Sequence, residues 1–350
     1  MGLITKIKRK AKTLDNMIRP LANDKWDYFV IVMDFLWCRS IFKVSRDEYL
    51  KYNFHNLKHR YRKNFLLHKH RIKYSNINYR GLGRSKYLVY KHISDLYQRE
   101  VILAPQCGEA SFLDFCKKYQ QIVLKADTGS MGKSVELFNY TDDATAIDLF
   151  ATFSKEKPKI CEPFIRQHKI LKQLNPVSVN TLRITSLLQN GEVEILSATL
   201  KCGVSEDNIT DNLSMGGIGA QVDISSGIVS TFGYDFEQKK YAYHPTTGVK
   251  IIGMQLPHWD TVISLVKAAH ARLPQCALFG WDIAITETGA DIVEANNRPG
   301  ARIMQRMDGI PKGKKIIPLI RQDRLKNKRK VYTAEMKKLY TQEFQVELSE

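Results

Sequence analysis

The sequence lacks the features that mark several familiar protein classes. Its six cysteines are scattered and form no Cys-x-x-Cys pair, which argues against a zinc site or a disulfide framework and favours free buried thiols in a reducing cytoplasm. No apolar segment follows the basic residues 1–12, so a secretory signal is not indicated. The most apolar early run, residues 28–38, is shorter than the roughly 20 residues that cross a bilayer, and Asp34 interrupts it. This run predicts a buried helix.

The chain also has no Walker motif (G-x-x-x-x-G-K-[ST]), no internal repeat and no low-complexity tract. It does have 350 residues, of which 43% are hydrophobic and 10% aromatic. This length and composition predict two or three folded domains and exclude a largely disordered protein.

Acidic residues are scarce at both ends of the chain. The net charge is +18, to which residues 1–100 contribute +15 and residues 311–350 contribute +6, so the middle carries −3. Basic ends of this kind attract polyanions such as nucleic acid, anionic lipid or phosphorylated glycans. The nearly neutral middle is where we expect the chemistry.

The hydrophobic pattern changes near residue 100. Residues 1–95 predict a basic, mostly helical region, and residues 311–350 predict a basic helical tail. Between them, strands alternate with helices. The predicted strands are 101–103, 121–125, 134–138, 159–162, 181–188, 193–201, 219–222, 277–285 and 291–294, and the predicted helices are 111–119, 142–155 and 259–272.

The most informative pattern is an Asp on one apolar strand followed by Glu-x-Asn on the next. The intervening turn, residues 286–290, contains a glycine and predicts a hairpin. A hairpin would bring Asp282 beside Glu294 and Asn296, and the last two share a face because they are two residues apart. Three oxygen ligands on one face are typical of a Mg²⁺ site that holds nucleotide phosphates.

Two glycine-rich loops could serve phosphates. The first follows Lys125, whose charge would add to the backbone N–H groups of the loop. Its candidate contacts are Thr128, Gly129, Ser130, Met131 and Gly132. The second, residues 212–220, could close over phosphates or hold an acceptor. Ordinary turns would look the same in both places.

Three basic residues lie in or next to predicted strands in the nearly neutral middle part of the chain. Arg183 stands in an apolar strand and needs a buried anionic partner, either a nearby carboxylate or a transferring phosphate. Lys201 ends the next strand and could reach the same place. Arg298 follows the metal ligands and could meet charge developing on a reacting oxygen.

In this order, the elements resemble an ATP-grasp domain over roughly residues 100–310. The resemblance is strongest in residues 178–183, 281–285 and 294–300, which are most similar to the sugar-transfer-associated ATP-grasp family. It implies an α+β fold in which two α+β subdomains clasp ATP. The expected domains are residues 1–95 (basic helical region), 96–165 (lid subdomain), 166–310 (C-terminal subdomain with the metal site) and 311–350 (basic tail).

The resemblance also implies roles for individual residues. Lys125 would contact the α- and β-phosphates, and Asp282, Glu294 and Asn296 would hold Mg²⁺, with Mn²⁺ as the alternative ion. Arg183 and Arg298 would stabilise the transferred phosphoryl group, with Lys201 close by.

The same resemblance assigns the adenine site to the segment that leaves the strand 159–162. Its residues are Glu162, Pro163, Phe164 and Ile165. Many family members hold the ribose with a carboxylate shortly after this segment, but residues 166–169 contain none, so His168 or Lys169 takes that place in the prediction.

The activity implied by the resemblance is that of an ATP-dependent carboxylate–amine ligase acting in cell-surface polysaccharide or glycan biosynthesis. Its expected partners are ATP with small carboxylates and amines, or a lipid-linked or surface glycan acceptor. The basic ends predict peripheral contact with an anionic membrane on the cytoplasmic side and no specific nucleic acid. Two alternatives stay open: an ATP-grasp kinase that phosphorylates a sugar or polyol hydroxyl, and an anionic-surface-binding protein with a degenerate ATP-grasp domain.

Overall fold

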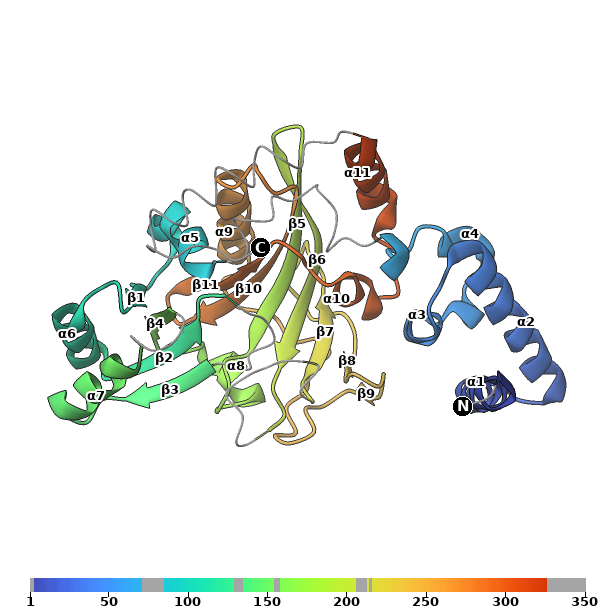
Figure 1. The fold of residues 1–350 in the computed structure, drawn as a ribbon, viewed down its shortest axis with the longest axis horizontal. Coiled ribbons are helices and arrows are strands. Elements are labelled where there is room, and N and C mark those ends of the chain that lie inside the picture. Colours follow the sequence, from blue (N-terminus) through green and yellow to red (C-terminus); the bar gives the residue numbers. More distant parts are fainter. Residues whose placement is uncertain are drawn as a thin grey trace. The chain divides into compact units, whose positions relative to one another are not determined.

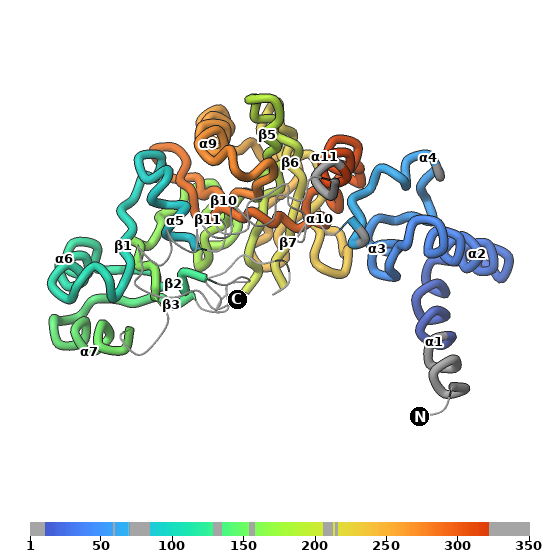
Figure 2. The backbone as a smooth tube through the Cα atoms, turned by 45° about the horizontal axis from the view of Figure 1, so that its top comes forward, coloured from blue at the N-terminus to red at the C-terminus, as the bar shows by residue number. Residues whose placement is uncertain are grey.

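The protein forms two compact units in the computed structural model, which describes residues 3–70, 85–128, 135–153, 158–205, 213 and 216–325 (Figure 1). Unit 1 consists of residues 1–71 and 309–317, and unit 2 consists of residues 72–308 and 318–350. The chain therefore leaves unit 1, builds the sheets of unit 2 and returns to unit 1, as the tube in Figure 2 traces.

Unit 1 is helical, as its sequence predicts. Its elements are α1 (Leu3–Ile18), η1 (Arg19–Leu21), α2 (Lys25–Phe42), α3 (Arg46–Lys51), η2 (Phe54–Asn56), α4 (His59–Arg62), η3 (His68–His70) and the start of α11 (Gly313–Leu325). Asp24 caps α2, and α3 begins with a capping box between Ser45 and Glu48. The two stretches of chain are joined where the Gly313 N–H donates to the Asn64 carbonyl at 2.8 Å.

Helix α2 is buried on one side only, so the predicted buried helix over residues 28–38 is wrong for its other side. Ile31, Phe35 and Cys38 enter the core of unit 1, but Phe29 and Met33 are 53% and 50% exposed. The physical reason is that α1 and η2 contact α2 and share a core with Ile31, Phe35 and Cys38, which lie on one side of the helix. Among the described residues, no helix combines the length and the apolar composition that crossing a membrane requires.

Unit 2 contains two antiparallel sheets. The small sheet has the order β1-β4-β2-β3, and the large sheet has the order β11-β10-β5-β6-β7-β8-β9. The strands of the small sheet are β1 (Ile102–Ala104), β2 (Gln121–Ala126), β3 (Val135–Asn139) and β4 (Lys159–Pro163). Those of the large sheet are β5 (Thr181–Gln189), β6 (Glu192–Cys202), β7 (Ile218–Val222), β8 (Gly233–Tyr234), β9 (Lys240–Tyr241), β10 (Leu278–Thr286) and β11 (Gly289–Asn296).

Helices complete unit 2. On the small sheet, α6 (Glu109–Tyr119) packs with α7 (Asp143–Phe153), and their aromatic residues fill a core of their own. On the large sheet, α9 (Trp259–Ala271) contacts β5, β6, β10 and β11. The remaining helices are α5 (Lys86–His92), η5 (Ser94–Leu96), α8 (Lys169–Leu174) and α10 (Ala301–Arg306).

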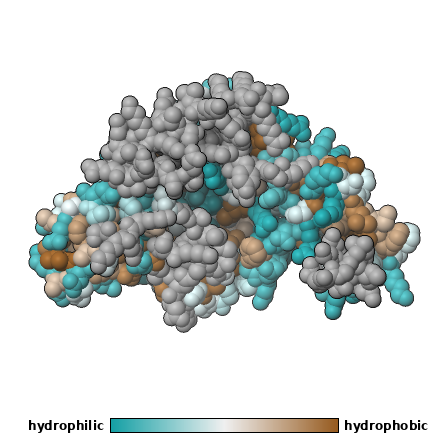
Figure 3. Space-filling view, in the orientation of Figure 1, coloured by the Kyte–Doolittle hydropathy of each residue, from teal (hydrophilic) through white to brown (hydrophobic). Residues whose placement is uncertain are grey.

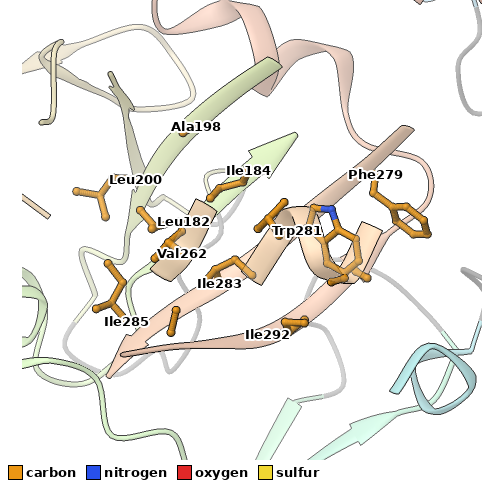
Figure 4. Packing of buried hydrophobic residues seen from close by; sticks show 14 of the residues in the cluster. Leu182, Ile184, Ala198, Leu200, Val262, Phe279, Trp281, Ile283, Ile285 and Ile292 are labelled. Atoms are coloured by element: carbon orange, nitrogen blue, oxygen red, sulfur yellow. The ribbon is translucent and has the colours of Figure 1, made fainter. Parts of the chain in front are cut away.

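The alternation of side chains gives the large sheet an apolar face and a polar face. Leu182 and Ile184 of β5 pack with Trp281 and Ile283 of β10 in the core that α9 joins (Figure 4). Because successive side chains of a strand point to opposite faces, Arg183 and the residues at equivalent positions of β10 and β11 lie on the other face. The fold thus collects charged side chains on the face away from α9.

The predicted strands agree with the observed ones, whose ends differ by at most two residues where both are described. The predicted helices 111–119 and 259–272 correspond to α6 and α9, and 142–155 corresponds to α7 as far as residue 153. Strands β8 and β9 and helices α8 and α10 were not predicted, because each is six residues or shorter and has little periodicity to detect. The part of the predicted basic tail after residue 325 lies outside the described residues.

Candidate functional site

Three charged side chains form a row across the polar face of the large sheet. In the strand register, Asp282 of β10 lies opposite Arg183 of β5 on one side and opposite Glu294 of β11 on the other. The predicted hairpin is confirmed, and it places Asp282 directly beside Glu294. Asn296 shares the face with Glu294 but lies opposite Gly280.

Asp282 is neutralised by two cations. Arg183 donates to both oxygens of Asp282 through one edge of its guanidinium, with Nε–Oδ1 at 2.7 Å and Nη2–Oδ2 at 2.8 Å, and Lys201 Nζ lies 3.3 Å from Oδ1. Burial by itself would raise the pKa of the Asp282 carboxyl, but the charges of Arg183 and Lys201 outweigh it and lower the pKa to about 2. Arg183 and Lys201 therefore both bind Asp282, and this carboxylate is the buried anionic partner that the sequence predicted for Arg183.

Gly280 makes room for this arrangement. A Cβ atom there would lie 2.9 Å from Pro299 Cβ and 3.4 Å from Arg183 Cδ. The missing side chain lets the segment after β11 pass close to the guanidinium. Arg298, the residue before Pro299, is exposed in the bend that follows β11.

Glu294 is the less compensated carboxylate of the row. Among the described residues, Lys86 pairs with it, with Nζ 4.0 Å from Oε1, and the Glu294 side chain is 29% exposed. Burial and the charge of Asp282 raise the pKa of Glu294. A carboxylate with a neighbouring carboxylate and an incomplete counter-charge is a suitable ligand for a cation, and the amide of Asn296 adds a third hard oxygen.

No group of three or more His, Cys, Asp or Glu side chains that could hold a metal occurs in the part of the chain that the structure describes. The candidate ligand set therefore consists of two carboxylates and one amide. Such a set suits an ion that keeps further oxygen ligands from water or phosphate, as Mg²⁺ does.

A second charged cluster lies between the two sheets and centres on Arg99. Its Nη2 donates to Glu162 Oε2 of β4 at 2.7 Å, and its Nη1 donates to Asp291 Oδ2 of β11 at 2.6 Å. Lys125 of β2 is also ion-paired with Glu162. Burial would raise the pKa of Glu162, yet the charges of Arg99 and Lys125 outweigh it and lower the pKa. Arg99 thus links the small sheet to the large one, a role that sequence reasoning missed because its partners are 63 and 192 residues away.

A pocket lies beside this cluster. Its walls come from the small sheet, from β11 and from the segment around α5, and its lining residues are Lys86, Val89, Tyr90, Tyr97, Val101, Lys125, Ile160, Glu162, Val293, Glu294 and Ala295. Of the predicted site residues it contains Lys125, Glu162 and Glu294. Sequence reasoning missed Lys86, Tyr90 and Tyr97, because residues 86–97 carry no motif that distinguishes them from the basic helical region.

The start of α5 is attached to the base of the first glycine-rich loop. Asp127 accepts hydrogen bonds from the Ser85 hydroxyl and from the Tyr87 N–H, both at 2.9 Å, and Lys86 Nζ donates to the Ala126 carbonyl at 3.1 Å. Thr128 is half-buried at the next position. The predicted phosphate contacts Gly129, Ser130, Met131 and Gly132 lie outside the described residues.

The segment after β4 continues beside the start of β2, an inner strand of the small sheet. Pro163 ends β4, the Phe164 N–H donates to the Gln121 carbonyl at 3.0 Å, and Ile165 is half-buried. His168 caps α8 by accepting from the Ile170 N–H at 3.2 Å.

A carboxylate does lie beside residues 168 and 169, although the local sequence has none. Glu287, in the turn between β10 and β11, accepts from the Lys169 N–H at 2.7 Å and lies 3.4 Å from His168 Nε2. The sequence could not indicate this carboxylate because it is 118 residues away from Lys169. In the second glycine-rich loop, residues 212 and 214–215 lie outside the described residues.

We expect Arg99→Met to destabilise the protein by about 3–5 kcal/mol, because it leaves Asp291 buried without its cation and removes one of the two cations from Glu162. Urea unfolding would measure the change. Arg272→Met is the matched control: Arg272 pairs with Asp95 at the surface, so its loss should change the stability far less. Equal effects of the two substitutions would contradict the role of Arg99 as the link between the sheets.

The depressed pKa of Asp282 predicts a specific pH dependence of stability. A carboxyl with a pKa of about 2 in the folded state and 3.8 in the unfolded state stabilises the protein above pH 4, and this contribution disappears as the pH falls towards 2. It amounts to about 2 kcal/mol at neutral pH. The difference in urea stability between the native chain and Asp282→Asn should therefore shrink between pH 5 and pH 3. The exposed residue Asp114 supplies the control Asp114→Asn, and a pH-independent difference for Asp282→Asn would argue against the ion pairing described above.

Comparison with known proteins identifies the fold family. The model of the sugar-transfer associated ATP-grasp family matches residues 111–317. No curated protein matches the chain. Solved structures with a similar fold include D-alanine–D-alanine ligase from Bacillus anthracis, with 15% identity, a TM-score of 0.43 and coverage of 75% of this chain and 72% of that one.

Two further ligases are similar at the same level. The ATP-grasp ligase PsnB, in complex with a minimal precursor, has 11% identity, covers 69% of this chain and 60% of its own, and has a TM-score of 0.43. L-amino acid ligase from Bacillus licheniformis has 12% identity, covers 68% of this chain and 48% of its own, and has a TM-score of 0.42. The chain thus spans 60% of the length of the PsnB ligase. The family match includes β2, the segment after β4, Arg183 and the β10–β11 hairpin, and the chain belongs to the sugar-transfer associated ATP-grasp family.

Proposed function

We propose that the chain is an ATP-dependent ligase that activates a carboxylate as an acyl phosphate and joins it to an amine. The observation that supports this most directly is the row Arg183–Asp282–Glu294 on one face of the large sheet. Glu294 also lines the pocket that contains Lys125 and Glu162. This combination offers cations for phosphate oxygens and hard oxygen ligands for their counter-ion within one unit.

In this proposal, both subdomains contribute residues that bind ATP and its metal ion. Residues 96–165, with the small sheet, form the lid, and residues 166–310, with the large sheet, form the C-terminal subdomain. Lys125 and Lys86 would bind the phosphates, while Glu162 and the chain from Pro163 to Ile165 would bind adenine. His168 and Lys169, with Glu287 beside them, would face the ribose. Asp282, Glu294 and Asn296 fit a Mg²⁺ ion, which would supply charge neutralisation of the triphosphate.

The proposed reaction has two displacement steps. An oxygen of the substrate carboxylate attacks the γ-phosphorus in line, an O–P bond forms, and the bond to the β–γ bridging oxygen breaks to release ADP. The amine nitrogen then attacks the acyl carbon, a C–N bond forms, the C–O bond to phosphate breaks, and the nitrogen loses a proton. The chain contributes orientation and charge stabilisation rather than a nucleophile of its own.

The catalytic cations are Arg183, Lys201 and Arg298. In the structure Arg183 and Lys201 hold Asp282, which fixes their side chains on the polar face of the sheet. A guanidinium held in this way needs little reorganisation when negative charge develops on the transferred phosphoryl group. Arg298 is exposed and therefore accessible to the substrate.

The proposed acceptor is an acidic or amino sugar of a surface glycan or of its lipid-linked precursor. The family description associates these proteins with sugar transfer, which favours this class of substrate. A lipid-linked acceptor would bring the protein to the cytoplasmic side of a membrane, so peripheral contact with anionic lipid belongs to the same proposal.

Trapping with hydroxylamine tests the reaction. The purified protein would be incubated with ATP, Mg²⁺ and pools of sugar acids or amino acids, and ADP release would be recorded. A ligase should give a hydroxamate when hydroxylamine replaces the amine, because an acyl phosphate reacts with it. ADP release that leaves a phosphorylated hydroxyl and no hydroxamate would instead indicate a kinase.

The metal ligands are tested by Glu294→Ala. We expect Mg²⁺-dependent ATP affinity to fall by about tenfold or more, because one of the two carboxylate ligands is lost, while the thermal unfolding temperature changes little. Titration calorimetry with and without Mg²⁺ would measure this. Glu192→Ala, at an exposed position at the start of β6, is the control. Unchanged Mg²⁺-dependent affinity in Glu294→Ala would refute the assignment.

A further inference from the structure

Helix α2 carries a second apolar stripe on its exposed side. Trp26, Phe29, Val30, Met33, Trp37 and Ile41 recur at intervals of one, three or four residues, and each is at least 42% exposed. We call these six residues the outer face of α2. Because residues at this spacing lie on one side of a helix, they form a continuous apolar strip. Figure 3 shows brown apolar atoms at the surface over α2, next to teal hydrophilic ones.

Exposed basic side chains lie at both ends of the outer face. Lys25 precedes it, and Arg39, Lys43 and Arg46 lie at its end or just beyond it. Residues 1–71 contain 17 Lys and Arg but six Asp and Glu, a net charge of +11. The apolar strip is therefore embedded in a cationic surface.

The acidic residues of unit 1 are largely occupied by internal partners. Asp34 binds Arg62 Nη1 and accepts from the Tyr49 hydroxyl at 2.6 Å. Glu48 completes the capping box with Ser45, and Asp15 pairs with Arg19 at 2.8 Å. Asp15 and Asp34 are thus paired with cations of the same unit, and Lys and Arg side chains remain in excess over residues 1–71.

We infer that the outer face of α2 docks on an anionic lipid surface. A helix with a strip of Trp, Phe and aliphatic residues beside Lys and Arg has the composition of helices that lie in the membrane–water interface. The two tryptophans suit that depth, and each nearby basic residue gains from the negative potential of anionic lipid. A second copy of the chain is a poorer occupant, because docking two such faces would bring two regions of charge +11 together.

This inference gives a specific surface to the membrane contact of the proposed function, but it does not depend on the ligase chemistry. A helix in the interface would hold unit 1 at the membrane, where a lipid-linked acceptor is found. Vesicle binding can be measured without ATP or acceptor, so failure of the docking surface and failure of the proposed reaction are distinguishable.

Vesicle sedimentation with the full chain tests the surface. The protein should bind vesicles of phosphatidylcholine with phosphatidylglycerol, bind pure phosphatidylcholine weakly, and lose binding as the salt concentration rises. The double variant Phe29→Glu, Met33→Glu should bind the anionic vesicles about tenfold or more weakly, because it places two carboxylates in the strip. Tyr243→Glu, at a 58% exposed position of unit 2, is the matched control and should bind normally.

A second variant separates charge from apolar contact. Arg39→Gln, Lys43→Gln should weaken binding to anionic vesicles and reduce its salt dependence, with little change on neutral vesicles. Circular dichroism and thermal unfolding would check that each variant folds, which is expected because all four positions are exposed.

Three outcomes would overturn the inference. One is undiminished vesicle binding by the Phe29, Met33 double variant. Another is equal binding to neutral and anionic vesicles. The third is a dimer in analytical ultracentrifugation that the double variant disrupts while native protein ignores both kinds of vesicle, which would assign the outer face to a second copy of the chain.

Discussion

The ion pairing of Asp282 with Arg183 and Lys201 is the interaction on which the site depends. Three neighbouring strands each contribute one of these side chains, and their pairing is possible because the register sets Asp282 opposite Arg183. A buried carboxylate is costly without such partners, and so is a buried guanidinium. The same pairing leaves Glu294, one strand further, with an incomplete counter-charge. The polar face is therefore asymmetric: Asp282 is neutralised by two cations of the protein, whereas Glu294 beside it is less compensated.

Arg99 has the corresponding role between the sheets. It binds Glu162 of the small sheet and Asp291 of the large sheet. A change in its ion pair with one sheet would therefore alter its ion pair with the other. Lys125 shares Glu162 with Arg99. A phosphate that attracted Lys125 would change the charge balance of Glu162 and thus the pairing of Arg99. In the proposed function, the electrostatics of nucleotide binding and of the contact between the sheets would be coupled through one carboxylate.

The sequence predicted the strands of both sheets and the β10–β11 hairpin, because alternating apolar residues and a glycine in the turn are local signals. It also predicted the family, which rests on the order of such signals. It could not predict the contributions of Lys86, Arg99 and Glu287, since each meets its partners through contacts distant in sequence. It misjudged α2, because hydrophobic composition alone does not tell a helix buried on all sides from one with an exposed apolar strip. Roles for the individual site residues remain predictions.

Unit 1 is built from two segments of the chain, one before and one after the residues that form the sheets of unit 2, and this order has a consequence for biosynthesis. Residues 309–317 complete unit 1, and the Gly313–Asn64 hydrogen bond joins them to its first segment. During translation, the amino-terminal helices emerge long before this closing segment, and the whole of both sheets is synthesised in between. The core of unit 1, formed by residues 17–67, is therefore synthesised well before the segment that completes the unit. Folding of unit 2 shortens the distance between the two stretches and lowers the entropic cost of joining them.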